Sequence, residues 1–184
     1  VVDSAMVDGS LSLMSFFYSL KEMGHWEDSR ESNLLDGFAH FYDTYECSDN
    51  KYIAVGSIEP QFYFELLEKL EINDEQFKDQ HNKDLWPRLK EKMAAKIKLK
   101  SRSEWVEIFS GTDACVSPVL SMEEAQEHPH NIAREAFTNI DGFNQPNASP
   151  RYSKTKPEIK HNAKDIGADL NDVCIEFNLT KEFF

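Results

Sequence analysis

One carboxylate in this sequence stands where its charge could serve chemistry. Glu59 directly precedes Pro60, and Pro60 opens residues 60–70, where apolar side chains recur at helical spacing. Backbone N–H groups and the helix dipole stabilise negative charge at the start of a helix. Glu59 is therefore either an ordinary helix cap or a fixed anion that orients and charges a histidine from another segment. Position and spacing alone leave both interpretations open.

The other titratable clusters give weaker signals. His128 and His130 lie near Glu124 and Glu127, but Pro129 breaks the helical spacing and no third ligand stands at a familiar distance. We therefore expect no metal site. The sequence also holds no phosphate-binding loop, dinucleotide fingerprint, serine-hydrolase elbow or zinc-protease helix.

Composition argues against two classes of partner. The 184 residues carry 33 acidic and 20 basic side chains, which gives a formal net charge of −13 and a pI near 4.8. This balance disfavours a nucleic-acid backbone or an anionic membrane as the main partner. No apolar run approaches the roughly 20 residues that span a bilayer. We expect neither nucleic-acid binding nor a membrane span.

Cysteine usage and the first residues favour a reducing compartment. Cys47, Cys115 and Cys174 are too few and too widely spaced for a disulfide framework, so we expect free and mostly buried thiols. The first residues show neither an initiator Met nor a signal-peptide pattern. We expect a protein that is not secreted and a chain that begins inside a larger polypeptide.

The hydrophobic pattern predicts which elements surround Glu59. β-branched and aromatic runs favour strands, and apolar side chains at every third or fourth position favour helices. The expected elements are strands at 51–56 and 114–120 and helices at 60–70, 85–97 and 103–109. Pro118 favours a sheet edge or a bend for the second strand, which we expect to be buried. Residues 48–140 are therefore predicted to form a small α+β domain.

Two flanking segments do not close a core of their own. Residues 1–24 are typical of the end of a strand followed by a helix, and residues 25–47 of an aromatic-rich linker. Residues 141–184 combine a proline-rich extended stretch with a last helix over 165–177. The first and last helices each present an apolar face with no obvious partner in the chain.

Four long motifs carry a family resemblance. They are NLLDG at 33–37, FYDTY at 41–45, VGSIEPQFY at 55–63 and GTDACVSPVL at 111–120. Through them the chain resembles the α-methylacyl-CoA racemases, a branch of the family III CoA-transferase superfamily. The resemblance covers nearly the whole chain in the same order and is weakest after Lys160.

The resemblance implies that the chain corresponds to the C-terminal half of such an enzyme. In the family, the first half is a large CoA-binding domain that carries the catalytic His and Asp. Residues 1–24 and 141–184 then belong to this incomplete large domain, with 25–47 as a linker and 48–140 as the small domain. The family also implies a homodimer of interlocked subunits, in which one small domain closes the active site of the other subunit.

The resemblance also implies a reaction and its residues. Glu59 matches a glutamate that works with the histidine of the first half as one acid/base, while the aspartate is the other. The reaction is inversion of the 2-methyl stereocentre of branched fatty acyl-CoA thioesters, by removal of the α-proton and reprotonation of a planar enolate. The residues implied to contact the acyl-CoA substrate are Tyr42, Ile58, Pro60, Asn33, Leu34, Leu35 and Asp36. CoA is part of the substrate, so no separate cofactor is expected.

Three positions depart from the family pattern. Glu31 and Phe38 stand where the familiar form has glycine, and His40 stands where it has proline. A phenylalanine removes the positive-φ freedom of glycine and adds a bulky ring near the acyl pocket. The sequence therefore leaves open the acyl preference and the path of this loop.

Two alternatives to a racemase stay open. One is a family III CoA transferase, in which an aspartate of the first half is the nucleophile. The other is a non-catalytic binding or oligomerisation fragment, and we expect the isolated chain to be inactive. The glutamate of IEPQFY at 58–63 favours the racemase branch. The resemblance suggests a peroxisome or mitochondrion in a eukaryote and the cytoplasm in a bacterium.

Overall fold

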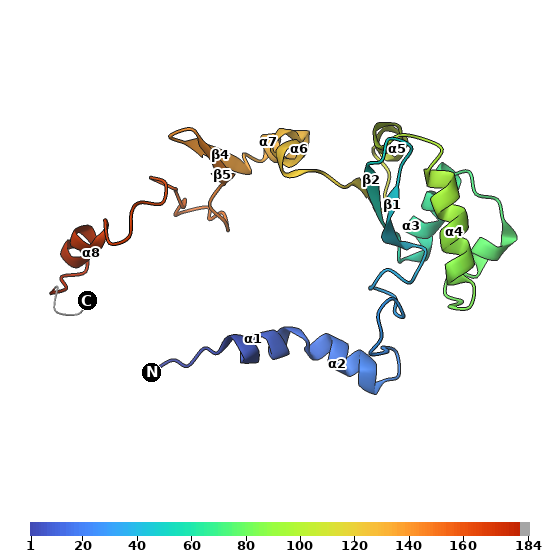
Figure 1. Cartoon of the computed structure of the whole chain (residues 1–184), viewed down its shortest axis with the longest axis horizontal. Coiled ribbons are helices and arrows are strands. Elements are labelled where there is room, and N and C mark those ends of the chain that lie inside the picture. The colour runs from blue at the N-terminus through green and yellow to red at the C-terminus, as the bar shows by residue number, and fades with distance from the viewer. Residues whose placement is uncertain (181–184) are drawn as a thin grey trace. The chain divides into compact units, whose positions relative to one another are not determined.

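The computed structural model describes residues 1–180 and divides into two compact units, Val1–Val119 and Leu120–Phe184. The first unit contains the helices α1 (Met6–Leu13), α2 (Ser15–Glu22), α3 (Pro60–Lys69), α4 (Trp86–Ile97) and α5 (Arg102–Phe109), the short 3₁₀ helix η1 (Glu75–Lys78) and the strands β1 (Tyr42–Glu46), β2 (Tyr52–Gly56) and β3 (Val116–Pro118) (Figure 1). The second contains α6 (Met122–Glu127), α7 (Pro129–Ala133), β4 (Phe137–Ile140), β5 (Phe143–Pro146) and α8 (Leu170–Glu176). The expected α+β class is confirmed.

A three-stranded antiparallel sheet organises the first unit, in the order β1-β2-β3. Because side chains alternate along a strand, one face carries Tyr45, Ile53 and Val55, which are all buried in the core. The opposite face carries Thr44 and Ala54, which lie directly across from each other. This second face is only partly covered, as is common for antiparallel sheets.

Helix α4 supplies the largest part of the core. The predicted four-residue spacing is confirmed at Leu89, Met93 and Ile97, whose side chains are completely buried. The helix begins at Trp86, which is also buried and whose ring packs edge-on against Phe41 at 5.6 Å. Burial of such a stripe is the main source of helix stability in a protein of this size.

Residues 25–47, predicted to be a linker, contribute an edge strand to this sheet. β1 pairs with β2 over its whole length, and the neighbouring Ala39, Phe41 and Cys47 are fully buried. The polar sequence YDTYE concealed the strand because it lies at the sheet edge, where one row of side chains faces outward.

The termini of several elements differ from the sequence expectations. Residues 4–24 form two helices that meet at Met14 instead of one, and no strand precedes them in the described chain. Helix α5 is capped by Ser101 and Glu104, which form a capping box, because this pair reaches the first free N–H groups. The expected buried strand 114–120 is shorter and partly exposed, although the edge position of Pro118 is confirmed.

The second unit contains a two-stranded β-hairpin and three short helices among the described residues. Strands β4 and β5 pair across a tight turn at Asp141 and Gly142, both with positive φ, so the proline-rich stretch begins with a strand. The last helix is shorter than 165–177. The expectation of mostly buried thiols holds for Cys47 and Cys174 but is wrong for Cys115, which is exposed. The predicted domain boundaries concern the assembled protein and stay predictions.

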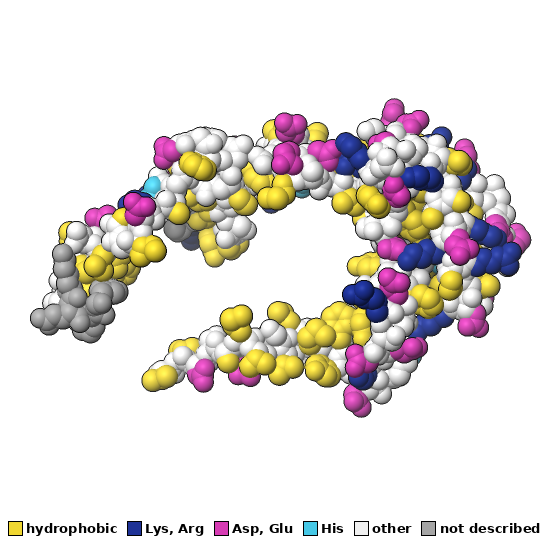
Figure 2. Space-filling view, viewed as in Figure 1, with side chains coloured by type: hydrophobic (Ala, Val, Ile, Leu, Met, Phe, Trp, Pro, Cys, Tyr) yellow, Lys and Arg dark blue, Asp and Glu magenta, His cyan; other side chains and the backbone are white. Residues whose placement is uncertain are grey.

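Exposed apolar side chains are concentrated on the first two helices. Figure 2 shows hydrophobic side chains along α1 and α2, where the exposed residues are Met6, Val7, Leu11, Leu13, Met14, Phe16 and Tyr18. Neither helix has a buried residue. An apolar surface of this kind is typical of an interaction face. Among the described helices, none is long and apolar enough to cross a membrane.

Candidate active site

The structure places Glu59 at the residue that precedes the first turn of α3. Its backbone is extended, with φ −74° and ψ 142°, and its carbonyl oxygen accepts from the N–H of Tyr63 at 3.0 Å. Within residues 1–180 its side chain makes no capping hydrogen bond, and it is exposed. The backbone of Glu59 is therefore fixed at the helix start, while its carboxylate does not cap the helix.

The loop before Glu59 is tied to the sheet through its backbone. The N–H of Gly56 donates to the carbonyl of Cys115 at 3.0 Å, and the N–H of Ser57 donates to that of Phe41 at 3.0 Å. The buried hydroxyl of Ser57 donates to the carbonyl of Ala114. Two otherwise unrelated segments, the ends of β1 and β3, thus fix the position of residues 56–58.

Cys115 lies close enough to Glu59 to be influenced by its charge. Its backbone is in the left-handed region, at φ 54°, and its thiol contacts the carbonyl of Asp113 at 3.4 Å. Partial desolvation, and then the carboxylates of Glu59, Asp113 and Glu65, raise the pKa of the Cys115 thiol above its usual value. A thiol of raised pKa is a poor nucleophile at neutral pH. The raised pKa of Cys115 therefore reports the nearby negative charge.

A groove of about 450 Å³ lies on the partly covered face of the sheet. It brings together three of the predicted substrate-contacting residues, Leu35, Asp36 and Tyr42. The ring of Tyr42 lies against Gly56, where a Cβ would meet it at 3.8 Å. The other lining residues are Gly37, Asp43, Thr44, Ala54, Val55, Gly56, Cys115 and Ser117.

The remaining predicted residues near Glu59 lie outside the lining of this groove. Ile58 and Leu34 are half-buried and pack against the hydrophobic core, and Pro60 is exposed at the first position of α3. These three residues do not line the groove, and their contact with a substrate stays a prediction.

Asn33 and Asp36 form a local hydrogen-bond network with the backbone of their own loop. Fully buried Asn33 accepts from the N–H of Glu27 at 2.7 Å and donates to the Glu27 carbonyl at 3.0 Å and to Asp36 at 2.8 Å. Asp36 in turn accepts from the N–H groups of Ser32 and Asn33. Desolvation raises the pKa of the Asp36 carboxyl, but the hydrogen bonds from Asn33, Ser32 and Phe38 outweigh it and leave the pKa lowered. Both side chains are thus occupied in folding the loop.

The three departures from the family pattern have distinct structural outcomes. Glu31 keeps the left-handed backbone expected of glycine, with φ 51°. The ring of Phe38 turns toward Trp86, with ring centroids 5.4 Å apart, and lines a second groove instead of the first. His40 is fully buried, with Nε2 at 2.7 Å from the hydroxyl of Tyr63. The Tyr63 hydroxyl donates to the Phe77 carbonyl, so the His40 Nε2 carries the proton.

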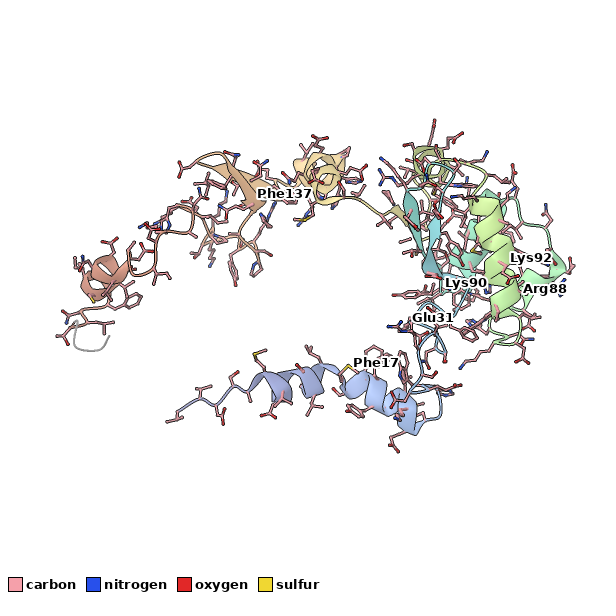
Figure 3. All side chains as sticks on the ribbon, in the orientation of Figure 1. Phe17, Glu31, Arg88, Lys90, Lys92 and Phe137 are labelled. Carbon is pink, nitrogen blue, oxygen red and sulfur yellow. The ribbon has the colours of Figure 1, made fainter. Side chains whose placement is uncertain are left out.

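Helix α4 fixes the loop that lines the groove. The ammonium of Lys90 donates to the carbonyl of Gly37 at 2.6 Å and forms an ion pair with Asp43. Figure 3 shows Lys90 on α4 near the loop that carries Glu31. Within residues 1–180, no three His, Cys, Asp or Glu side chains are grouped so that they could hold a metal ion.

Comparison with known proteins places this geometry in a family. A sequence model described as CoA-transferase family III matches residues 1–170. The chain belongs to CoA-transferase family III. The Mus musculus alpha-methylacyl-CoA racemase is 40% identical over 99% of this chain and 48% of its own length, and the Homo sapiens protein of that name is 39% identical with the same coverage. A Caenorhabditis elegans CaiB/baiF CoA-transferase family protein is 29% identical over 82% of this chain and 43% of its own.

A solved structure supports the fold of this family III chain. The crystal structure of Rv3272 from Mycobacterium tuberculosis matches with a TM-score of 0.64 and 14% sequence identity. The match covers 88% of this chain and 43% of that one. The chain spans about half the length of the curated relatives it matches.

Sequence reasoning missed two residues that contact the Glu59 loop. Ser57 lies inside the VGSIEPQFY motif at 55–63, in which it has no predicted role of its own. Gln80 lies in a polar turn that shows no recognisable pattern. Burial is the signal that identifies both, since Ser57 is 0% and Gln80 7% exposed. Buried polar side chains of this kind are expected to hold specific hydrogen bonds.

Proposed function

We propose that this chain is the C-terminal part of an α-methylacyl-CoA racemase that acts on branched 2-methylacyl-CoA thioesters. The proposal is supported by the 40% and 39% identity to two proteins of that name over 99% of the chain. It is also supported by the groove that gathers Leu35, Asp36 and Tyr42 on one face of the sheet.

The 40% and 39% identity to two racemases is the observation that carries the proposal, and Glu59 is the residue to which the proposal assigns the chemistry. At an ordinary N-cap the side chain bonds to the free N–H groups of the first turn, whereas Glu59 does not. Its exposed position leaves the carboxylate available to a group from outside the described residues. A carboxylate that contacts an imidazole stabilises the imidazolium and so raises its basicity.

In the proposed reaction two bases stand on opposite faces of the thioester. One base, the imidazole assisted by Glu59, takes the α-proton from one face, and the electron pair moves into the planar enolate. The conjugate acid of the other base returns a proton to the opposite face, which inverts the stereocentre. Both bases come from the N-terminal half of the family's enzymes, which precedes the part that matches this chain. CoA enters as part of the substrate.

The assembly and location follow the same proposal. The apolar faces of α1 and α2 pack on the preceding half, and two such subunits interlock as a homodimer. A peroxisome or mitochondrion is the proposed location in a eukaryote, and the cytoplasm in a bacterium.

The test is exchange and inversion catalysed by the protein with its preceding half restored. We expect the α-proton of a 2-methylacyl-CoA to exchange with deuterated water while either epimer converts to the other. Transfer of CoA to a free acid without α-exchange would instead identify a CoA transferase, the activity in the name of the family. Rapid exchange by this chain alone would contradict the proposal, because its bases would then have to lie within residues 1–184.

A further inference from the structure

We infer that Gln80 is a positioning residue that aims the Glu59 carboxylate, an inference that rests on the proposed function. Gln80 lies in the turn between η1 and α4, far from Glu59 in the sequence. The family resemblance gives it no role. The two hydrogen bonds of its side-chain amide assign the role, because both end on the loop that carries Glu59.

The amide nitrogen of Gln80 bridges two successive carbonyl groups. Nε2 donates to the carbonyl oxygen of Ser57 at 3.1 Å and to that of Ile58 at 2.9 Å. An NH₂ group has two protons, so these two acceptors use its full donor capacity. The side chain is only 7% exposed, so water does not compete freely for these carbonyls.

Gln80 is itself held in place by the core. The indole N–H of Trp86 donates to the carbonyl oxygen of Gln80 at 2.7 Å, and Trp86 is 2% exposed. The backbone of Gln80 is thereby fixed to the first residue of α4. Hydrogen bonds thus connect Trp86 of α4 to Gln80, and Gln80 to the loop at residues 57–58.

The consequence falls on Glu59 because the peptide that Gln80 holds leads directly into it. The carbonyl that Gln80 holds belongs to the peptide that joins Ile58 to Glu59, and because this peptide is planar the hydrogen bond fixes the Cα from which the Glu59 side chain starts. The carboxylate makes no capping bond in the described chain that could orient it locally. A small displacement of a catalytic group costs rate far more than it costs binding.

The variant Gln80→Met tests the inference in the restored full-length protein. Methionine keeps the unbranched shape and length but has no donor. We expect kcat for α-proton exchange to fall about tenfold or more with KM changed less than about twofold. Gln76→Leu is the matched control, since Gln76 lies in the same region but its side chain accepts from Lys92.

A double-mutant cycle separates positioning from simple loss of structure. If Gln80 acts through Glu59, Gln80→Met lowers kcat by less than about twofold in a Glu59→Gln background. An equal loss in both backgrounds would assign Gln80 a structural role and overturn the inference. The proposed function fails separately if Glu59→Gln alone leaves exchange unchanged.

Folding is monitored so that every result decides the question. Should Gln80→Met not fold, Gln80→Glu provides the second variant, because it keeps the size and removes both donors when ionised. A folded Gln80→Glu protein with reduced kcat and the same non-additivity supports the inference. Loss of folding in both variants, or a folded variant with normal kcat, overturns it.

Discussion

The carboxylate of Glu59 lies close enough to the thiol of Cys115 for its charge to raise the pKa of that thiol. Partial desolvation is the larger cause, and the charge of Glu59 is the next, of the raised pKa of this thiol. Gly56 links the two residues, because its N–H donates to the Cys115 carbonyl at 3.0 Å. The reactivity of the Cys115 thiol therefore reports whether the Glu59 charge lies nearby.

Replacing Glu59 is expected to speed alkylation of Cys115. In Glu59→Gln the negative charge is gone, the pKa of the thiol falls, and the thiolate fraction at neutral pH increases. Iodoacetamide labelling followed by mass spectrometry measures the rate at Cys115, since Cys47 and Cys174 are buried. Glu68→Gln, on the exposed side of α3, is the matched control. A labelling rate unchanged by Glu59→Gln would show that the two groups are not neighbours.

His40 is expected to make stability depend on pH. Burial, with a contribution from His81, lowers the pKa of His40 from 6.5 to about 3. Between these values the unfolded chain binds a proton that the folded chain excludes, so stability is full above pH 6.5 and is lost as the pH falls toward 3. Between pH 7 and pH 5 the free energy of unfolding should fall by about 2 kcal/mol on account of His40.

Urea unfolding at the two pH values measures this effect. His40→Gln, whose amide can still donate to the Tyr63 hydroxyl, should lose much less stability on acidification than the parent protein. His130→Gln should behave like the parent, because His130 is exposed. Equal pH dependence in the parent and His40→Gln proteins would rule out a buried neutral imidazole.

Glu31 is expected to be a strained position that glycine would relieve. Its φ of 51° lies in the left-handed region, which costs a residue with a Cβ about 1 kcal/mol. Glu31→Gly should therefore raise the free energy of unfolding by about 1 kcal/mol, measured by urea denaturation. Glu68→Gly, inside α3, should lower it by a similar amount. A destabilised Glu31→Gly protein would mean that the loop takes another path.

Asn33 is expected to contribute to stability through the Glu27 backbone. Asn33→Ala leaves the N–H and the carbonyl of Glu27 without the partners shown at 2.7 and 3.0 Å. Loss of about 2 kcal/mol in the free energy of unfolding is the expected result. Asn82→Ala removes an amide of intermediate burial that contacts Asp79 and the N–H of Asp84 at the surface, and should cost less. If both variants are equally stable, the hydrogen bonds between Asn33 and Glu27 do not stabilise the loop.

The sequence pattern was sufficient to predict helices whose limits depend on residues within a few positions of one another. The spacing of Leu89, Met93 and Ile97 predicted α4, and Pro60 marked the first residue of α3, because periodicity and the fixed φ of proline act within one turn. The motif resemblance predicted seven substrate-contacting residues, and three of them, Leu35, Asp36 and Tyr42, line one groove. Their contact with a substrate stays a prediction.

Features that depend on distant partners were not visible in the sequence. β1 is a strand because β2 pairs with it, and nothing in YDTYE announces that partner. Asn33 also bonds through its amide to the Glu27 backbone, which only the folded loop brings near, and its contact with a substrate stays a prediction. Gln80 lies in a polar turn, and its role follows from Trp86 and from two carbonyls beyond α3.

Isotope exchange by a Glu59→Gln protein tests the central claim most directly. The full-length protein and its variant would be incubated with a 2-methylacyl-CoA in deuterated water, with Glu68→Gln as the control for an exposed glutamate of α3. If Glu59 assists an imidazole base, deuterium incorporation at the α-carbon should fall about a hundredfold in Glu59→Gln and stay normal in Glu68→Gln. Unchanged incorporation in a folded Glu59→Gln protein would contradict the account and leave Glu59 as a residue at a helix start.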